Sequence, residues 1–272
     1  MTSEMFGELV RYRGLLGMLA WRDIRVRYKQ SVIGIAWAFF MPLIQAVVLF
    51  TIFSFGFKGD GITGGTPWKM PYFLFVLSGV IPWSFFAGGV NSSIESLTRN
   101  ARLVTKIYFP REVFPLGSVV ASMVDFAIGS LVLIVPYIYF MAKGLVRPSA
   151  LILILPLVIL IQVFFVAGLT LILSMANLFF RDVKYIMTFM LQLWFFATNV
   201  MYPIEFSSYP KLKLLLNLNP MIGILDAYRD AIAGTYLRNP GSLAFSAVIA
   251  LVVFFFGWRI FHKAEFKFAE YV

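Results

Sequence analysis

Long apolar stretches dominate the chain, and the short segments between them carry most of its charged residues. A helix needs about 20 apolar residues to cross a bilayer. Because lipid offers no partners for backbone N–H and C=O groups, each long apolar stretch is expected to be helical. The pattern therefore predicts an all-α integral membrane protein with six transmembrane helices. The six predicted spans are residues 32–57, 71–92, 113–142, 149–179, 185–202 and 242–259.

The predicted spans differ in length and regularity. The third and fourth are longer than a bilayer requires, so they are expected to tilt or to extend beyond the interface. The fifth is short and ends before Pro203. Prolines inside spans predict kinks, since proline lacks the N–H of the helical hydrogen bond. These prolines are Pro82, Pro136 and Pro156.

Composition supports a polytopic membrane protein. Hydrophobic residues make up 60% of the chain, charged residues 13%, and the mean hydropathy is +0.85. A soluble domain of this size could not bury so much apolar surface in one core. The chain has no cysteine and one histidine, His262, so the sequence predicts neither a disulfide framework nor a metal site. Residues 1–30 lack the apolar core of a cleavable signal peptide.

The distribution of basic residues predicts the orientation. If both termini lie on one side, that side carries 15 of the 23 lysines and arginines. The positive-inside rule then places both termini in the cytoplasm. The net charge of +10 is attributed to basic segments beside anionic lipid, so no nucleic-acid partner is expected.

The segment before the first span, residues 1–31, is predicted to hold an amphipathic interfacial helix over residues 5–29. Arg13 and Arg27 fall on its apolar side and would have to snorkel. The helix is either an electrostatic anchor alone or a surface that also contacts a partner. Its basic side consists of Arg11, Arg22, Arg25 and Lys29, and its apolar side of Leu9, Tyr12, Leu16 and Ala20.

A basic segment, residues 93–112, connects the second and third spans. Ser92 and Glu95 have the spacing of a capping box, which predicts a short helix that ends at Phe109-Pro110. Apolar and basic residues alternate on that helix. This is typical either of an ordinary basic loop or of a helix that binds in a partner's groove. The apolar positions are Leu97, Ala101 and Val104, and the basic ones are Arg99, Arg102 and Lys106.

The long outer segment, residues 204–241, predicts two short re-entrant or interfacial helices. The first covers residues 210–218, and the second begins at Asn219-Pro220 and ends near Gly234. One side of the second helix carries Asp226, Arg229 and Asp230, which are close enough to pair. We interpret this set as a structural ion cluster rather than a catalytic one.

Asp125 is the only one of the 13 acidic residues within a predicted span. It is expected to accept hydrogen bonds from Ser, Thr or Asn on neighbouring helices, or alternatively to line the translocation path. The sequence contains no G-x-x-x-x-G-K-[ST] phosphate-binding loop, no H-E-x-x-H and no G-x-S-x-G. The chain is therefore not expected to be an enzyme, and a nucleotide-driven machine would need its ATPase on another chain.

An ordered series of motifs resembles the ABC-2-type polysaccharide exporters and covers nearly the whole chain. Each motif is unspecific alone, and the order carries the resemblance. The motifs are Trp21 to Ser31 followed by Gly34 and Trp37, Ser78-Gly79 with Pro82-Trp83, Lys106-Ile107-Tyr108-Phe109-Pro110-Arg111, Phe180-Arg181-Asp182-Val183, Pro203, and Asn219-Pro220-Met221.

The resemblance implies a permease subunit of the bacterial inner membrane that exports lipid-linked O-antigen, teichoic acid or capsular polysaccharide. It implies a homodimer with two ABC ATPase subunits, which would hold ATP and Mg, and no cofactor on this chain. The interfacial helix and residues 93–112 would contact the ATPase. The residues assigned to this contact are Arg22, Arg25, Glu95, Leu97, Arg99, Ala101, Arg102, Val104, Lys106 and Arg111.

The polymer would pass between the two permease subunits, where aromatic side chains offer stacking faces without fixed charge. The alternative is that these aromatics pack helices or face lipid. The candidates for a glycan channel are Trp37, Phe40, Trp83, Phe86, Trp194, Phe195 and Tyr202.

Two other function classes compete with an ATP-driven exporter. An ATP-independent secondary transporter or lipid scramblase would depend on Asp125. A membrane glycosyltransferase would need a cluster of metal-binding carboxylates, and the sequence shows none.

Overall fold

The computed structural model describes residue 7 and residues 11–56, 70–106, 109–202, 216, 218–234 and 236–271. Its regular elements are helical, as the apolar pattern predicts. In chain order they are α2 (Arg13–Tyr28), η1 (Gly34–Ala36), α3 (Trp37–Gly56), α4 (Tyr72–Ile94), α5 (Ser96–Arg99), α6 (Ala101–Lys106), α7 (Val113–Ala142), η2 (Ala150–Ile154), α8 (Leu155–Phe179), α9 (Val183–Phe196), α11 (Pro220–Ala233), α12 (Pro240–Ala264), η3 (Glu265–Lys267) and α13 (Phe268–Tyr271).

Five helical segments in the described part of the chain are long and apolar enough to cross a membrane. They correspond to five of the six predicted spans. The sixth, predicted at residues 185–202, is only the 14-residue helix α9, followed by turns at residues 197–200. At 1.5 Å per residue α9 is about 21 Å long, shorter than the hydrocarbon core of about 30 Å.

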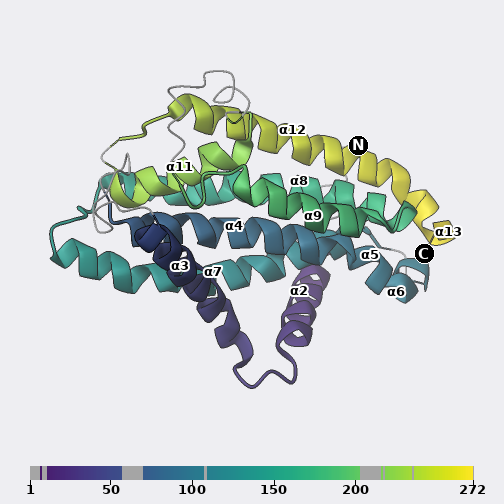
Figure 1. Cartoon of the computed structure of the whole chain (residues 1–272). Helices are drawn as coiled ribbons and strands as arrows, with labels where there is room; N and C mark the ends of the chain where they lie inside the picture. Colours follow the sequence, from purple (N-terminus) through teal and green to yellow (C-terminus); the bar gives the residue numbers. More distant parts are fainter. Residues whose placement is uncertain are drawn as a thin grey trace.

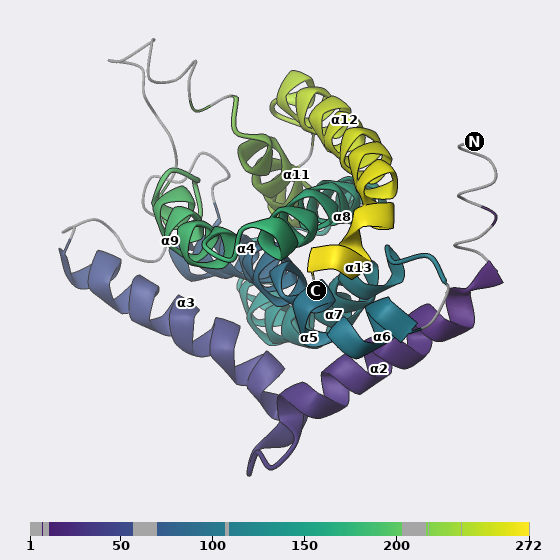
Figure 2. The same ribbon diagram turned by 90° about the vertical axis from the view of Figure 1, so that its right-hand side faces the viewer.

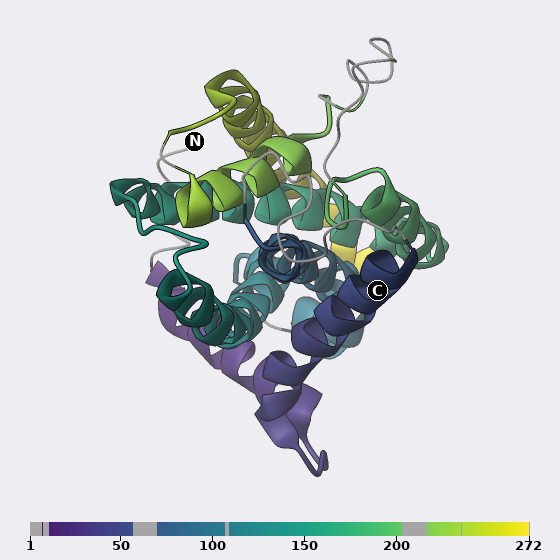
Figure 3. The ribbon, with the colours of Figure 1, turned by 60° about the vertical axis from the view of Figure 1, so that its left-hand side comes forward.

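Helix α4 lies at the centre of the bundle, ringed by the other long helices (Figure 3). Most of its side chains are buried, whereas α3, at the edge, is largely exposed. Polar contacts tie α4 to its neighbours. Gln162 Nε2 donates to the carbonyl oxygen of Pro82 at 2.7 Å, and Tyr228 Oη donates to Gln162 Oε1 at 2.8 Å. α4, α8 and α11 are thereby joined through a buried side chain with satisfied hydrogen bonds.

Helices α8 and α12 pack closely because glycine faces glycine. A Cβ on Gly168 would come within 2.5 Å of the Phe254 nitrogen, and a Cβ on Gly257 within 2.6 Å of the Gly168 carbonyl oxygen. Small residues let backbones approach where no hydrophobic effect drives helices together in lipid. Helix α12 is therefore fixed along the fourth predicted span.

Helices α2 and α3 form a V that projects from the bundle (Figure 1). The turn between them uses positive φ angles at Gln30 (62°) and Gly34 (60°). Glycine adopts a positive φ angle readily, which suits the residue at position 34. α2 then runs across the bundle rather than along it, as a helix at a membrane surface would.

Two predicted helix ends differ from the structure. The capping box at Ser92 and Glu95 is wrong, because α4 continues to Ile94 and Ser92 Oγ bonds the Gly89 carbonyl oxygen within that helix. The second outer helix is as predicted, since Asn219 Oδ1 caps α11 by accepting from the Met221 N–H at 3.0 Å, and Gly234 follows its end. The first outer helix, residues 210–218, lies almost entirely outside the described residues.

Candidate functional site

Helices α5, α6 and α13 gather at one end of the bundle, called here the α6 end (Figures 1 and 2). This end holds the predicted ATPase-contacting segment. Arg102 is exposed on it. Arg99 is also exposed and donates to the Ser92 carbonyl oxygen. The side chain of Lys106 lies outside the described residues, and Ala101 is half-buried.

Leu97 and Val104 were expected to enter a partner's groove, but the structure buries both within the chain. They are 0% and 1% exposed and belong to a cluster with Phe114, Leu171 and Phe268. Helical spacing correctly marks an apolar face. That face packs on α7, α8 and the C-terminal helices, so it is unavailable to a partner in this conformation.

Arg111 and Glu95 also turn toward the chain itself. The Arg111 guanidinium donates to the backbone carbonyl of Glu265 and lies over the Phe268 ring at 5.8 Å. Lys184 Nζ lies 2.5 Å from Glu95 Oε1, which links α9 to the start of α5. Beside this pair is a cavity of about 350 Å³, lined by Glu95, Thr98, Ala101, Asn177, Arg181, Lys184, Tyr185 and Tyr271.

The N-terminal helix α2 packs its apolar face on α7. Leu19, Ala20 and Ile24 are buried there, and the backbone of α2 approaches Gly117. The opposite side is exposed: Arg25 lies over the Trp21 ring at 5.3 Å. Arg22 Nη2 pairs with Asp23 Oδ1 at 2.9 Å. The basic face of α2 therefore points away from the bundle, toward headgroups or a partner.

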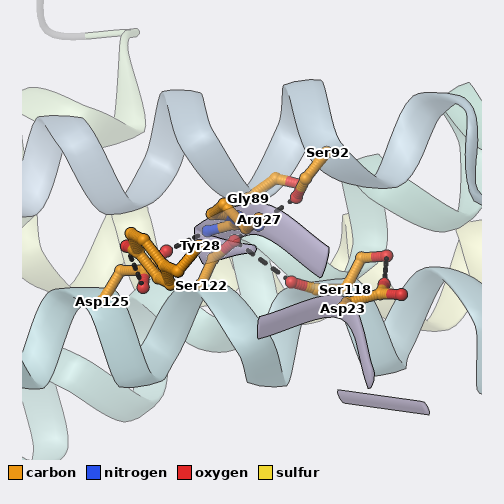
Figure 4. Close-up of polar contacts among 8 residues, drawn as sticks. All are labelled: Asp23, Arg27, Tyr28, Gly89, Ser92, Ser118, Ser122 and Asp125. Carbon is orange, nitrogen blue, oxygen red and sulfur yellow. Dashed lines mark hydrogen bonds and ion pairs between the residues drawn. The ribbon is translucent and has the colours of Figure 1, made fainter. Parts of the chain in front are cut away.

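Asp125 is joined to α2 rather than to Ser, Thr or Asn side chains (Figure 4). The Arg27 guanidinium forms an ion pair with Asp125 Oδ2. Tyr28 Oη donates to Asp125 Oδ1 at 2.8 Å. Burial is the main cause that raises the pKa of Tyr28, and the hydrogen bond to Asp125 is the second. The phenol therefore keeps its proton. The expected partners of Asp125 were wrong because a cationic partner stabilises a carboxylate better than neutral groups do.

Serines extend this polar contact between α2, α7 and α4 (Figure 4). Ser118 Oγ donates to Asp23 Oδ2 at 3.0 Å, and Ser122 Oγ lies 3.3 Å from Ser92 Oγ. A cavity of about 210 Å³ opens beside them, between α2, α3, α4 and α7. It is lined by Arg27, Tyr28, Trp37, Ala38, Met41, Pro42, Ile81, Ser84, Phe85, Gly88, Ser122, Asp125, Phe126 and Gly129.

Four of the seven proposed channel aromatics form one cluster. Trp83 lies 5.5 Å from Phe195 and Phe86 lies 5.1 Å from Trp194, measured between ring centroids. Phe86 and Trp83 are buried, at 0% and 5% exposure, so they pack α4 against α9. Trp194 Nε1 donates to Asn219 Oδ1 at 3.0 Å.

The other three candidates lie apart from that cluster. Trp37 lines the cavity beside Arg27, and Phe40 is 41% exposed on α3. Tyr202 Oη donates to the Phe196 carbonyl oxygen, which closes the turn after α9.

The predicted outer ion cluster exists, but it is more buried than a polar helix face would be. Arg229 is 0% exposed and Asp230 2% exposed. Arg229 Nη1 lies 3.5 Å from Asp226 Oδ1, Nη2 donates to the Asn199 carbonyl oxygen at 2.6 Å, and the guanidinium stacks on Phe75 at 3.8 Å. Asp230 Oδ2 accepts from the Arg238 N–H at 2.9 Å. The cluster fixes α11 to α4 and the turn after α9.

Arg27 and Tyr28 were not among the predicted site residues. A signal for Arg27 was present: it lies on the apolar side of the N-terminal helix, and one acid occurs within the spans. A basic residue that faces the bundle and an acid that needs a partner are expected to meet.

Residues 14–233 match the family described as ABC-2 type transporter. The chain belongs to this family. It is 32% identical over 264 residues to the O-antigen export system permease protein RfbA of Myxococcus xanthus, and the match covers 97% of each chain. It is 29% identical over 259 residues to RfbA of Klebsiella pneumoniae, covering 94% of each. It is 24% identical over 253 residues to the polysialic acid transport protein KpsM of Escherichia coli, covering 90% of this chain and 91% of that protein.

Membership of the ABC-2 type transporter family confirms the resemblance seen in the sequence. Members are membrane subunits of transporters and are not catalytic themselves. Together with its apolar helices, the family places the chain in the inner membrane as a multi-pass protein.

Proposed function

We propose that this chain is the permease subunit of an ATP-driven exporter of lipid-linked polysaccharide, O-antigen or a related glycan. The similarity to an O-antigen export permease along 97% of both chains carries the proposal. The chain has no phosphate-binding loop, so ATP and Mg would be held by two ABC ATPase subunits. Two copies of the permease would form a homodimer, each with six membrane crossings and both termini in the cytoplasm.

The α6 end would then face the cytoplasm and receive the ATPase. Within residues 93–112, the exposed basic side chains that the structure describes are Arg99 and Arg102. The cavity lined by Glu95, Arg181 and Lys184 adjoins them. Motion of the ATPase would reach the bundle through α5, whose Leu97 is buried against the core.

The Arg27–Asp125 contact supports a second part of the mechanism. It joins α2, on the surface, to α7, in the bundle, beside the cavity that Trp37 lines. Displacement of α2 by the ATPase would open this contact. A stacking ring beside charged and hydroxyl groups suits a hydrated glycan or its charged carrier.

Reconstitution with a partner ATPase tests the proposal. The chain is co-expressed with a candidate ABC ATPase, and export of glycan is followed in proteoliposomes. Export should require ATP and should stop when the catalytic carboxylate of the ATPase is replaced. Export that continues with the inactive ATPase would contradict an ATP-driven mechanism.

The competing secondary transporter or scramblase is less favoured by the structure. Asp125, the residue on which ion coupling would depend, is already paired with Arg27. Transport that follows an ion gradient and loses that dependence in Asp125→Asn would support this alternative.

A further inference from the structure

Three side chains that are far apart in the sequence meet between the start of α7 and the end of α12. Glu112 precedes the first residue of α7, His262 lies in the last turn of α12, and Glu265 begins η3. One oxygen from each carboxylate and one His262 nitrogen all lie within 4.8 Å of one another. The group contains the only histidine of the chain.

The distances match those between ligands of a tetrahedral metal. His262 Nδ1 lies 3.2 Å from Glu112 Oε1 and 3.4 Å from Glu265 Oε1. With zinc–ligand bonds of about 2.0–2.1 Å, neighbouring ligand atoms in a tetrahedral site lie about 3.3–3.4 Å apart. One imidazole and two carboxylates form a three-ligand set that leaves the fourth position for water.

A second, independent observation concerns Glu112. Its side chain is 3% exposed, and its other oxygen, Oε2, has no hydrogen-bond partner among the described residues. A buried carboxylate oxygen without a partner is costly. A cation beside this carboxylate would supply the missing interaction.

The nearest cationic side chain in the sequence, Arg111, does not occupy the position that such a cation would take beside Glu112. The adjacent Arg111 directs its guanidinium to the Glu265 backbone carbonyl and the Phe268 ring. His262 is 25% exposed and Glu265 18% exposed, which provides a path from solvent.

We propose that Glu112, His262 and Glu265 bind a divalent transition-metal ion of the zinc class. The ion would tie the start of α7, directly after residues 93–112, to the C-terminal end of α12. Bound metal would thus restrict the segment proposed to receive the ATPase. The metal site itself does not depend on the proposed function, and its test measures binding rather than transport.

The binding test uses the purified full-length chain with an affinity tag that contains no histidine, because His262 must be the only imidazole. Metal is removed with a chelator, and Zn²⁺ is added in competition with a fluorescent indicator. We expect one Zn²⁺ per chain. Glu112→Gln and His262→Asn should each weaken binding about tenfold or more. Asp182→Asn, which removes an exposed carboxylate elsewhere on the chain, should leave binding unchanged.

A second measurement uses the single histidine. Diethyl pyrocarbonate gives an N-carbethoxyimidazole with its own ultraviolet absorbance, so this signal reports on His262, the one histidine, and saturating Zn²⁺ should suppress it. If Glu112→Gln fails to fold, as judged by size-exclusion chromatography, Glu265→Gln takes its place because Glu265 is partly exposed. Absence of saturable Zn²⁺ binding, or binding that none of the ligand variants weakens, would overturn the proposal and leave only an ion pair between His262 and the two carboxylates.

Discussion

Gly79 on α4 leaves the space that the buried guanidinium of Arg229 occupies. A Cβ at this position would lie 2.7 Å from Arg229 Nη2 and 2.8 Å from the Val200 carbonyl oxygen. Gly79→Ala should therefore displace the guanidinium from its backbone acceptors and destabilise the fold by about 1–3 kcal/mol. The midpoint of chemical unfolding in detergent measures the loss. Gly88→Ala on the same helix is the control, since its Cβ would meet nothing within 4 Å.

Arg102 is exposed at the α6 end and has no ion-pair partner among the described residues, so its charge is available to another protein. Arg102→Glu should weaken association with the partner ATPase by about two- to tenfold, as expected for an interface charge. Stimulation of ATP hydrolysis by the permease gives the measurement. Arg147→Glu reverses an exposed charge on the predicted outer side and should have no effect, and an equal loss in both variants would contradict the assigned contact.

At the scale of elements, α2 is held to α7 by an apolar face, by one ion pair, and by the hydrogen bonds that Ser118 and Tyr28 donate to Asp23 and Asp125. Asp125→Asn should loosen the helix by about 1 kcal/mol, because the Arg27 guanidinium loses its carboxylate in a partly exposed contact. Hydrogen exchange of the α2 amides measures the change. The double variant Arg27→Gln with Asp125→Asn should cost less than the sum of the single variants. Arg25→Gln, on the exposed side, serves as the control, and strict additivity at Arg27 and Asp125 would show that the pair does not hold α2.

Elements bounded by charge were predictable from the sequence. The third span was expected at residues 113–142 and α7 has these limits, because Glu112 and Lys143 end the apolar stretch on each side. The fifth span was overestimated, because apolar residues continue past the point where α9 ends. The turn that follows is stabilised from a distance, by Asn219 Nδ2 donating to Thr198 Oγ1 at 2.8 Å. Local hydropathy contains no information about such a contact.

The candidate site was also only partly predictable from the sequence. Helical spacing identified the apolar face of residues 97–104 but could not tell whether this chain or a partner covers it. The Arg27–Asp125 pair and the Glu112–His262 contact join positions 98 and 150 residues apart, which only the folded chain brings together.

At the scale of the whole molecule, α9 offers the strongest reason to expect a second copy. It is too short to cross the bilayer alone, and Leu191 is its only buried residue. The turn that follows is covered by the chain itself, with Thr198 0% and Asn199 2% exposed, whereas most of α9 is not. The exposed apolar face of α9, which includes Phe189 and Leu193, is therefore expected to lie at the interface of a homodimer.

The absence of cysteine from the chain makes this interface directly testable. Phe189→Cys and Leu193→Cys, made singly, should give a dimer band with a bifunctional maleimide in native membranes. Val252→Cys on α12 is the matched control, because Val252 is 57% exposed and Phe189 56% exposed in the single chain. If both helices faced only lipid, cysteines on α9 and on α12 should crosslink equally little. A dimer formed through α9 brings together only the cysteines on α9. Equal crosslinking on α9 and α12, or crosslinking on α12 alone, would place the contact between copies elsewhere.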